Sequence, residues 1–335
     1  MKKHYGPFIL LGVLIAFPLV VSDSYYRHLM ILVLMWVAIG SGWNLIAGYT
    51  GQVSFGDAAF FGTGAYAAGL LTVKLGVSSW WGLGLGGLMA IAVAFPFGWV
   101  CFRLRGAYFA LATLALNEVM RHIATIWESL TGGMVGVLIT PSFVSKVPYY
   151  YIALAIAALS ITTIHTVVNS RWGYYFISIR EDQDTAESIG INTHYYKMIS
   201  LCLAAFLTGL AGSLYMNYMG FIDPQVVFSL HDISIMAILV GIVGGVSTVY
   251  GPAMGAFIMV AVSEVFRTGG FGLLDSVAKA TGQPWIIIVT NYIKEAHVLS
   301  FGLLVIIVIL FLPNGVVGDW EKLKRSILSR RTIPT

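Results

Sequence analysis

The sequence predicts an all-α polytopic integral membrane protein with about ten transmembrane helices, some of them broken at glycines. Three observations predict this class: 58% of the 335 residues are apolar, only 10% are charged, and 37 are glycine. Soluble domains carry about 25% charged residues. A chain so poor in charge cannot cover a water-facing surface of this size. The composition therefore disfavours a cytosolic globular protein, a disordered protein and a nucleic-acid binder.

The predicted elements follow from the thickness of a bilayer, because a spanning helix needs about 20 mostly apolar residues. Ten stretches fit: 7–21, 27–47, 57–75, 82–102, 107–127, 149–169, 198–219, 232–248, 252–267 and 298–313. The first stretch is predicted to be a retained helix. The alternative is a cleaved signal, but no convincing small-x-small cleavage site follows Lys2 and Lys3. Residues 268–297 either form an outward loop or enter the membrane, so eight to eleven helices fit the sequence.

Lys and Arg residues predict the orientation. Ten crossings place both termini on one side of the membrane, together with the basic tail 318–335. That side carries Lys2, Lys3, Arg103, Arg105, Arg171, Arg180, Lys197, Lys322, Lys324, Arg325, Arg330 and Arg331. The opposite side carries Arg27, Lys74, Lys146, Arg267, Lys279 and Lys294. The positive-inside rule therefore predicts that both termini are cytoplasmic. The tail is interpreted as an orienting anchor rather than a specific lipid site.

A loop over residues 171–197 is predicted to be cytoplasmic and to contain a short capped helix. Glu181, Asp182 and Asp184 would lie in its first turn, where the helix dipole favours acidic residues. Ala186 and Ile189 are three residues apart and would share a face. Gly190 fits the position after the last turn. Such a rigid projection suits a protein that receives force from a cytoplasmic partner, and the alternative is a solvated connector.

Several motifs, in one order along the chain, resemble those of a known family. They are Asn44–Tyr66, Arg103–Ala110, Leu130–Gly133, Ile179–Ile191, Gly212–Tyr215 with Phe221–Pro224, Gly241–Ser247 with Tyr250–Pro252, and Leu312–Gly315. With them the chain resembles, over roughly residues 28–318, the LivM-like membrane permease subunits of bacterial branched-chain amino-acid ATP-binding-cassette (ABC) importers. The family commonly carries His at the position of Asp57, and this departure bears on the substrate.

The resemblance implies a single transmembrane permease domain over residues 1–335 in the bacterial inner membrane. It implies a second homologous permease subunit, two cytoplasmic ATPases, a periplasmic solute-binding protein and the lipid bilayer as partners, and no nucleic acid. The loop 171–197 would be the coupling loop, seated on one ATPase through Arg180, Glu181, Asp182, Ala186, Ile189 and Gly190. The chain contains no Gly-Lys pair and so no phosphate-binding Walker loop. We therefore expect it to bind no cofactor and to be no enzyme, with ATP and Mg²⁺ used by the partner ATPases.

Two glycine-rich stretches predict the translocation pathway. Gly48-x-x-Gly51-x-Val-Ser54 matches Gly241-x-x-Gly244-x-Val-Ser247, and the topology gives both stretches the same orientation. Paired interruptions of spans are the best sequence pointer to a transporter's site. Chance similarity and close helix packing, as at the small-x-x-x-small pairs Gly82/Gly86 and Gly251/Gly255, are the alternatives. The candidate pathway residues in these stretches are Asn44, Gly51, Gln52, Ser54, Asp57, Gly244, Gly245 and Ser247.

Two charged features inside apolar sequence complete the candidate pathway. Asp57 either faces a cavity, where it would meet the ammonium group of an amino acid, or caps the helix 57–75. Glu118 and Arg121 lie on one helical face with His122 and Thr125. This stripe is a polar seam along the pathway, a structural ion pair, or an acid–base pair of an intramembrane enzyme. No nucleophile or metal-ligand motif accompanies the stripe, which disfavours the enzyme.

The expected cargo is leucine, isoleucine or valine, because the resemblance is to branched-chain amino-acid importers. The same family also serves urea, other amino acids and short amides. A self-contained secondary transporter or channel is the rival of another class, and it would need an ion-coupling site of its own. Asp223 and Asp232 begin a predicted outward loop. They are interpreted as turn formers, with docking of a solute-binding protein as the alternative.

Overall fold

The computed structural model of the protein describes residues 6–78, 80–267, 302 and 315–318. The helices are α1 (Gly6–Val20), α2 (Ser24–Trp43), α3 (Asp57–Leu75), α4 (Trp81–Cys101), α5 (Ala107–Ile126), α6 (Glu128–Thr131), α7 (Val147–Val168), α8 (Arg171–Glu181), α9 (Gln183–Ser188), α10 (Thr193–Met219), α11 (Pro224–Val227), α12 (Met236–Gly244) and α13 (Gly251–Arg267). Two π-helices are η1 (Asn44–Tyr49) and η3 (Leu230–Ile235), and η2 (Gly133–Val135) is a 3-10 turn. Strands β1 (Val137–Leu138) and β2 (Phe221–Ile222) pair antiparallel.

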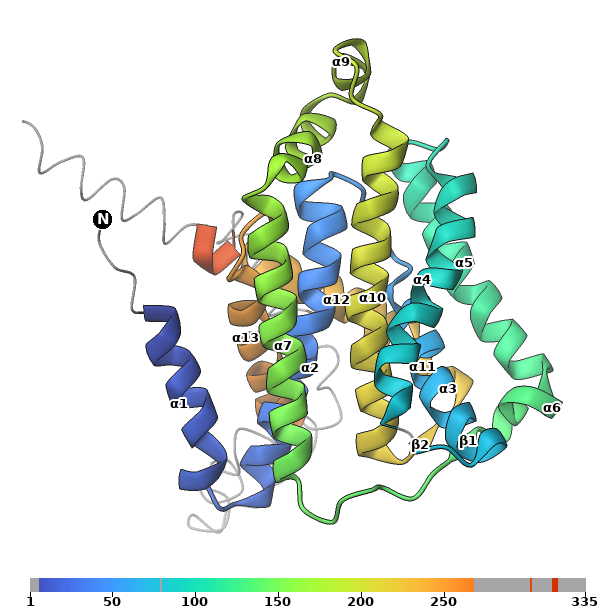
Figure 1. Cartoon of the computed structure of the whole chain (residues 1–335), viewed down its shortest axis with the longest axis vertical. Helices are drawn as coiled ribbons and strands as arrows, with labels where there is room; N and C mark the ends of the chain where they lie inside the picture. The colour runs from blue at the N-terminus through green and yellow to red at the C-terminus, as the bar shows by residue number, and fades with distance from the viewer. Residues whose placement is uncertain (1–5, 79, 268–301, 303–314, 319–335) are drawn as a thin grey trace, which may run out of the picture.

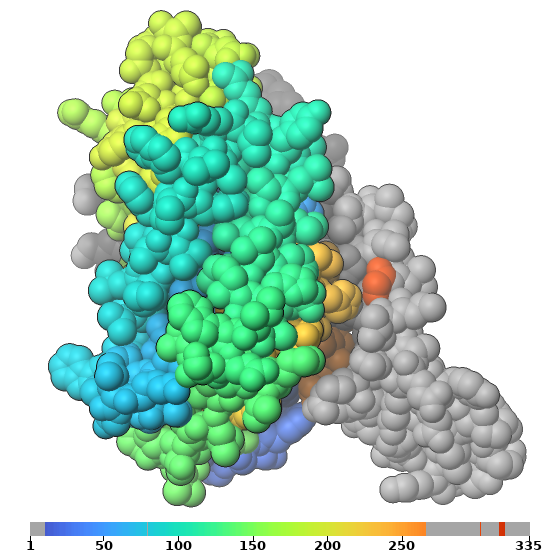
Figure 2. All heavy atoms as spheres, turned by 90° about the vertical axis from the view of Figure 1, so that its right-hand side faces the viewer, coloured from blue at the N-terminus to red at the C-terminus, as the bar shows by residue number. Residues whose placement is uncertain are grey.

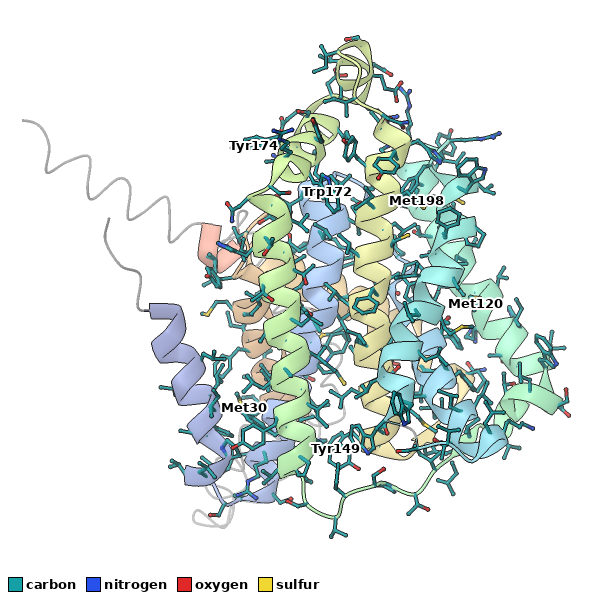
Figure 3. The ribbon with its side chains drawn as sticks, viewed as in Figure 1. Met30, Met120, Tyr149, Trp172, Tyr174 and Met198 are labelled. Carbon is teal, nitrogen blue, oxygen red and sulfur yellow. The ribbon has the colours of Figure 1, made fainter. Side chains whose placement is uncertain are left out.

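The long helices lie side by side as one bundle with two distinct ends (Figure 1). α8 and α9 project at one end, which we call the α9 end. β1, β2 and α6 lie at the opposite end, which we call the β end. Large aromatic side chains mark both ends: Trp172 and Tyr174 lie near the α9 end and Tyr149 near the β end (Figure 3). Aromatic residues at both ends are typical of membrane helices, whose ends lie at the lipid headgroups.

Six segments in the described part of the chain are long and apolar enough to cross a membrane. They are Ser24–Tyr49, Asp57–Leu75, Trp81–Cys101, Val147–Val168, Thr193–Met219 and Pro224–Gly244. The predicted count of about ten is therefore only partly reached. The predicted spans 7–21 and 252–267 correspond to shorter apolar helices, Leu11–Val20 and Gly251–Val265. Except for Gly302, the predicted span 298–313 and the undecided stretch 268–297 lie outside the described residues, and so does the tail beyond residue 318.

α5 differs from the predicted span 107–127. It is a 20-residue helix that runs from the α9 end to the β end, but it is not among the six apolar segments. The physical reason is its composition, because Asn117, Glu118, Arg121 and His122 lower its mean hydropathy. Figure 2 shows α5, in teal to green, on the outside of this face of the bundle.

Glycines allow α3, α4 and α10 to pack closely. A Cβ added at Gly212 of α10 would clash with the backbone of Phe61 in α3, and a Cβ at Gly64 of α3 would clash with the backbone of Gly209. A Cβ at Gly82 of α4 would lie 2.5 Å from the Cα of Ala68. A Cβ at Gly86 would also lie 2.8 Å from the carbonyl oxygen of Gly64. The contacts of Gly82 and Gly86 confirm that this predicted small-residue pair serves close helix approach.

Candidate functional site

The two glycine-rich stretches lie against each other at the α9 end. Asn44, the first residue of η1, donates from Nδ2 to the carbonyl oxygen of Thr248 (2.8 Å). The Oδ1 atom of Asn44 accepts from the backbone N–H of Ser247, also at 2.8 Å. The ring of Trp43, directly before Asn44, packs against Gly241, and Gly40, one turn before Asn44, packs against Val240. α2 and α12 therefore run in the same direction and end together, which confirms the predicted common orientation.

Both stretches leave regular helix geometry where they meet. α2 widens into the π-helix η1, a form that occurs mostly as short insertions at functional sites. After η1, Gly51 has φ +73°, and after α12, Gly245 has φ +127°. Ser247 has φ +60° without being glycine, which is unusual for a residue with a Cβ atom. The predicted breaks are thus present in the backbone. We call residues 44–52 the first break and residues 244–248 the second break.

Close packing also explains part of the glycine pattern. A Cβ at Gly244 would clash with the backbone of Gly251, at the start of α13, and a Cβ at Gly255 would clash with that of Val240. Gly244 is therefore required for the contact between α12 and α13. The alternative of helix packing accounts for this residue, whereas the positive φ angles of Gly51 and Gly245 require a backbone explanation.

The loop 171–197 contains two helices joined at a kink. The sequence predicts Glu181 in the first turn of a single short helix, and this is wrong. Glu181 is instead the last residue of α8, and Asp182 interrupts the helix with extended backbone (φ −157°, ψ 114°). Asp182 caps α9, because its Oδ1 accepts from the backbone N–H of Thr185 at 2.8 Å. Gly190 follows α9 with φ +88°, as predicted.

The predicted apolar face of this short helix is also wrong. Ala186 is 2% exposed and packs toward the protein, whereas Ile189 is 70% exposed. Ile189 is the cap residue that follows α9, and its side chain points to the surface instead of sharing the buried side of Ala186. Ala186 therefore belongs to the contact between α9 and the bundle, and Ile189 is the surface residue of the two.

A buried lysine links α9 to α10, a role that the sequence pattern did not predict. Lys197 of α10 is 0% exposed and donates from Nζ to Oε1 of Gln183 at 2.5 Å. Gln183 donates from Nε2 to Oε1 of Glu187 (2.9 Å), which also accepts from the hydroxyl of Thr193 (2.5 Å). The signal in the sequence was a lysine four residues after Thr193, at the start of an otherwise apolar helix. This polar network ties α9 to the start of α10, so residues 183–188 form a defined helix held against the bundle.

Two carboxyl groups of this loop have lowered pKa values. Hydrogen bonds from Thr185 lower the pKa of Asp182 below its ordinary 3.8. Hydrogen bonds from Thr193 and then Gln183 lower the pKa of Glu187 below its ordinary 4.5. A lowered folded-state pKa stabilises the fold above the unfolded-state pKa, and this stability is lost as the pH falls through the folded-state value.

We therefore expect amide exchange of residues 183–188, corrected for the intrinsic rate, to rise as the pH falls below about 4. The control is the double variant Asp182→Asn, Glu187→Gln, in which asparagine still caps the helix but neither side chain titrates. The rise should disappear in that variant. An unchanged low-pH rise in the double variant would contradict this account.

Asp57 lies in a buried polar region behind the first break. It is 2% exposed, and its Oδ2 atom has no hydrogen-bond partner among the described residues. The alternative that Asp57 caps the helix is wrong, because the cap position of α3 is Gly56 and Asp57 is the first helical residue. Gln52 is 9% exposed and Ser54 is 1% exposed. The carbonyl oxygen of Ser54 accepts from the Trp43 indole N–H at 3.0 Å.

The buried polar face of α5 is not the predicted stripe. Glu118 and Arg121 form an ion pair at 2.5 Å, with 36% and 27% of their side chains exposed, and His122 is exposed. Thr113 and Asn117 are instead 0% exposed. Thr113 Oγ1 accepts from the N–H of Phe55 at 3.0 Å, and Asn117 Nδ2 donates to the carbonyl oxygen of Phe228 at 3.1 Å. Their i, i+4 spacing was the signal that could have found them.

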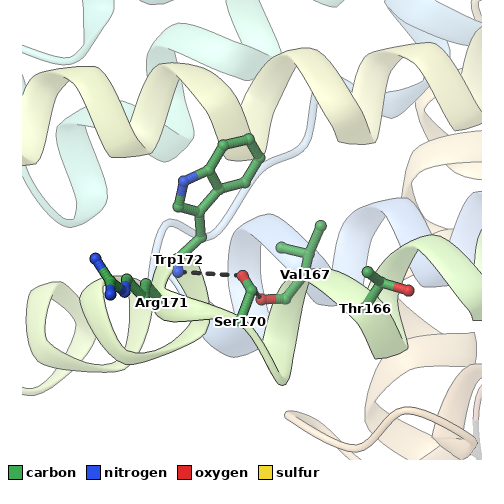
Figure 4. Close-up of a pocket in the computed structure, with 5 residues that line it drawn as sticks. All are labelled: Thr166, Val167, Ser170, Arg171 and Trp172. Carbon is green, nitrogen blue, oxygen red and sulfur yellow. Dashed lines mark hydrogen bonds between the residues drawn. The ribbon is translucent and has the colours of Figure 1, made fainter.

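Two other features fall outside the pathway. Asp223 accepts at Oδ1 from the N–H groups of Gln225 and Val226, which makes it the turn former that the sequence predicts. A shallow pocket lies where α7 meets α8 (Figure 4). Its lining is Thr166, Val167, Ser170, Arg171 and Trp172, and it contains no predicted pathway residue. The described residues contain no group of three or more His, Cys, Asp or Glu that could hold a metal ion.

A helical bundle with membrane-length segments, whose two broken helices meet a helical loop at one end, is the architecture of a polytopic transport permease. The chain belongs to the family described as "Branched-chain amino acid transport system / permease component", which matches residues 25–309. It is therefore a permease component of an ABC transporter, a transport subunit that is not itself catalytic.

Named relatives agree with this family. The chain is 26% identical over 295 residues to the high-affinity branched-chain amino acid transport system permease protein LivM of Escherichia coli (strain K12), covering 77% of this chain and 67% of LivM. It is 24% identical to LivH of the same system and organism, covering 84% and 91%. It is also 24% identical to the autoinducer 2 import system permease protein LsrC of Yersinia pseudotuberculosis (serotype O:1b, strain IP 31758), covering 58% of each chain.

Proposed function

We propose that this chain is the permease subunit of an ABC importer that carries leucine, isoleucine or valine across the bacterial inner membrane. The observation that supports it most is the position of the loop 171–197. Arg180 of this loop lies on both breaks of the bundle, so a movement of the loop reaches the predicted pathway directly. A coupling role needs such contacts, because a partner can shift a conformation only through contacts that differ between the two states.

The partners follow from the family. Two cytoplasmic ATPases bind and hydrolyse ATP with Mg²⁺ and press on the coupling loop, and this chain binds no cofactor of its own. LivM and LivH are both named as permease proteins of one transport system, which supports a second, homologous permease subunit beside this one. A periplasmic solute-binding protein delivers the cargo and supplies much of the selectivity.

The α9 end is the cytoplasmic end in this proposal. The described basic residues at the α9 end are Arg103, Arg105, Arg171, Arg180 and Lys197, and those at the β end are Arg27, Lys74, Lys146 and Arg267. The positive-inside rule places the richer end in the cytoplasm. α1, α5, α13 and residues 298–313 complete the ten spans, with both termini cytoplasmic.

Labelling of single cysteines tests this orientation in a variant that lacks Cys101 and Cys202. We expect a membrane-impermeant thiol reagent added outside spheroplasts to label Ser145→Cys, next to the exposed Val144 at the β end, and to spare Ser188→Cys in α9. After permeabilisation both positions should react. Labelling of position 188 from outside would reverse the orientation and remove the coupling role.

Uptake by the reconstituted complex tests the substrate. The chain is purified with its partner permease, ATPases and binding protein, and the complex is placed in proteoliposomes. Radiolabelled leucine is added on the side of the membrane that carries the binding protein, and ATP is supplied on the side that carries the ATPases. We expect uptake that requires ATP and that unlabelled isoleucine and valine inhibit. Inhibition by urea or short amides alone would assign another substrate of the family. Because LsrC is named as a permease of an autoinducer 2 import system, inhibition by autoinducer 2 alone would also assign another substrate. Solute flux through the chain alone would favour a secondary transporter or channel.

A further inference from the structure

One side chain joins the loop 171–197 to both breaks. Arg180 of α8 donates from Nη1 to the carbonyl oxygen of Gly48 in the first break (3.1 Å). The same nitrogen donates to the hydroxyl oxygen of Ser247 in the second break (2.7 Å). The Ser247 hydroxyl in turn donates to the Gly48 carbonyl oxygen at 2.6 Å. Three segments far apart in the sequence are thus linked through one guanidinium group.

Glu181 fixes the orientation of the Arg180 guanidinium group by bonding the edge that carries Nε and Nη2. Glu181 Oε1 accepts from Nη2 of Arg180 at 2.6 Å and from Nε at 3.1 Å. This side-on pairing uses one edge of the planar group and leaves Nη1 to face the two breaks. The Gly48 carbonyl belongs to the end of η1, where unpaired helix carbonyls favour a positive charge.

Gly51 allows α8 to lie this close to the first break. A Cβ at Gly51 would lie 2.8 Å from Cγ and 3.1 Å from Cα of Arg180. Gly51 also has φ +73°, which disfavours any residue with a Cβ. The backbone of the first break is therefore shaped to receive the stem of Arg180.

We propose that Arg180 is a positioning residue that acts as a latch between the coupling loop and the pathway. In the arrangement seen here it ties the loop to both breaks, which Asn44 and Ser247 also bond to each other. When the loop 171–197 moves, the guanidinium group leaves Gly48 and Ser247 together, so both breaks lose their tie to the loop in one step. The inference rests on the proposed function and adds the residue through which force reaches the pathway. It also revises the sequence interpretation of Arg180, because its side chain faces the bundle rather than a partner surface.

The test compares Arg180→Gln and Arg180→Lys with Arg171→Gln in the complete complex in nanodiscs and proteoliposomes. Arg171 is an exposed arginine of the same helix and makes none of these contacts, so it controls for lost charge. We expect Arg180→Gln to lower the number of solutes transported per ATP hydrolysed about tenfold, the scale of a lost charge-assisted hydrogen bond, with the ATPase rate retained. Arg180→Lys should recover part of this ratio, because it keeps the charge but cannot bond Glu181 and both breaks at once.

Amide exchange supplies a measurement that does not depend on the substrate. In the wild-type complex, a non-hydrolysable ATP analogue should change the exchange of residues 44–52 and 244–250 together. In Arg180→Gln both responses should be lost, while the response of residues 183–188 remains. A purely structural role predicts instead that ATPase rate, uptake and all exchange responses fall together, and this outcome would overturn the proposal.

Wild-type transport per ATP and wild-type exchange responses in Arg180→Gln would also overturn it. Failure of the proposed function has a different signature, because the wild-type complex would then take up none of the offered solutes. The exchange experiment still decides on the latch in that case, since it uses the nucleotide analogue alone.

Discussion

Replacing Gly212 with alanine is expected to lower the free energy of unfolding by about 3 kcal/mol, the upper range for adding a methyl group to a packed interior. The added Cβ would clash with the carbonyl oxygen of Phe61 and would lie 3.1 Å from the backbone nitrogen of Ala65. These are backbone atoms of α3 that cannot rotate away, so α3 and α10 must separate. Thermal unfolding of the purified protein in detergent measures the loss.

Gly84→Ala in α4 is the matched control for this variant. A Cβ at Gly84 meets no atom within 4 Å. Alanine favours a helix over glycine by about 1 kcal/mol, so this variant should unfold at the wild-type temperature or above it. If Gly212→Ala also unfolded at or above the wild-type temperature, the close packing of α3 on α10 would not exist as described.

Replacing Lys197 with methionine is expected to lower transport per ATP about tenfold in the reconstituted complex. Methionine keeps much of the side-chain volume but removes the donor that holds Gln183, and a buried group that loses its partner costs about 1–3 kcal/mol. α9 then loses the hydrogen bond between Gln183 and residue 197 of α10. The coupling loop therefore deforms when an ATPase presses on it, and less of the movement reaches the pathway. Uptake and ATP hydrolysis, measured in the same proteoliposomes, give the ratio.

Amide exchange of residues 183–188 should rise about tenfold in the same variant, because α9 opens more often. Lys74→Met is the control: Lys74 lies at the β end and donates to the carbonyl oxygen of Ser129 in an exposed contact. Wild-type exchange in α9 together with wild-type transport in Lys197→Met would show that the buried network does not stiffen the loop.

The sequence indicated the two breaks for a reason that lies in local chemistry. Glycine is costly inside a regular helix, so its repeated spacing in two stretches marks places where the backbone departs from one. The predictions for Glu181 and for Ile189 beside Ala186 were wrong, because the position of a helix end can depend on a single residue. Asp182 can continue a helix or cap the next one, and the hydrogen bond to Thr185 decides between the two.

The buried polar positions were harder to predict. Thr113 and Asn117 are buried, whereas Glu118 and Arg121 are partly exposed, although all four lie within nine residues of α5. The sequence favours Glu118 and Arg121 as the functional pair, because a charged residue in an apolar segment is costly. Which face of α5 turns inward depends on its contacts with Phe55 and Phe228. Both residues lie far from α5 in the sequence, so the local spacing within α5 cannot predict these contacts.

Composition and spacing by themselves determined the membrane class, the positions of the breaks and the capped loop, because each follows from the local cost of charge, glycine or an uncapped helix end. Only the tertiary structure decided that Arg180 of the loop bonds Gly48 and Ser247, and that Lys197 holds α9. These contacts join residues 14 to 132 positions apart, and no local preference of the chain encodes which of its distant segments the folded bundle brings together.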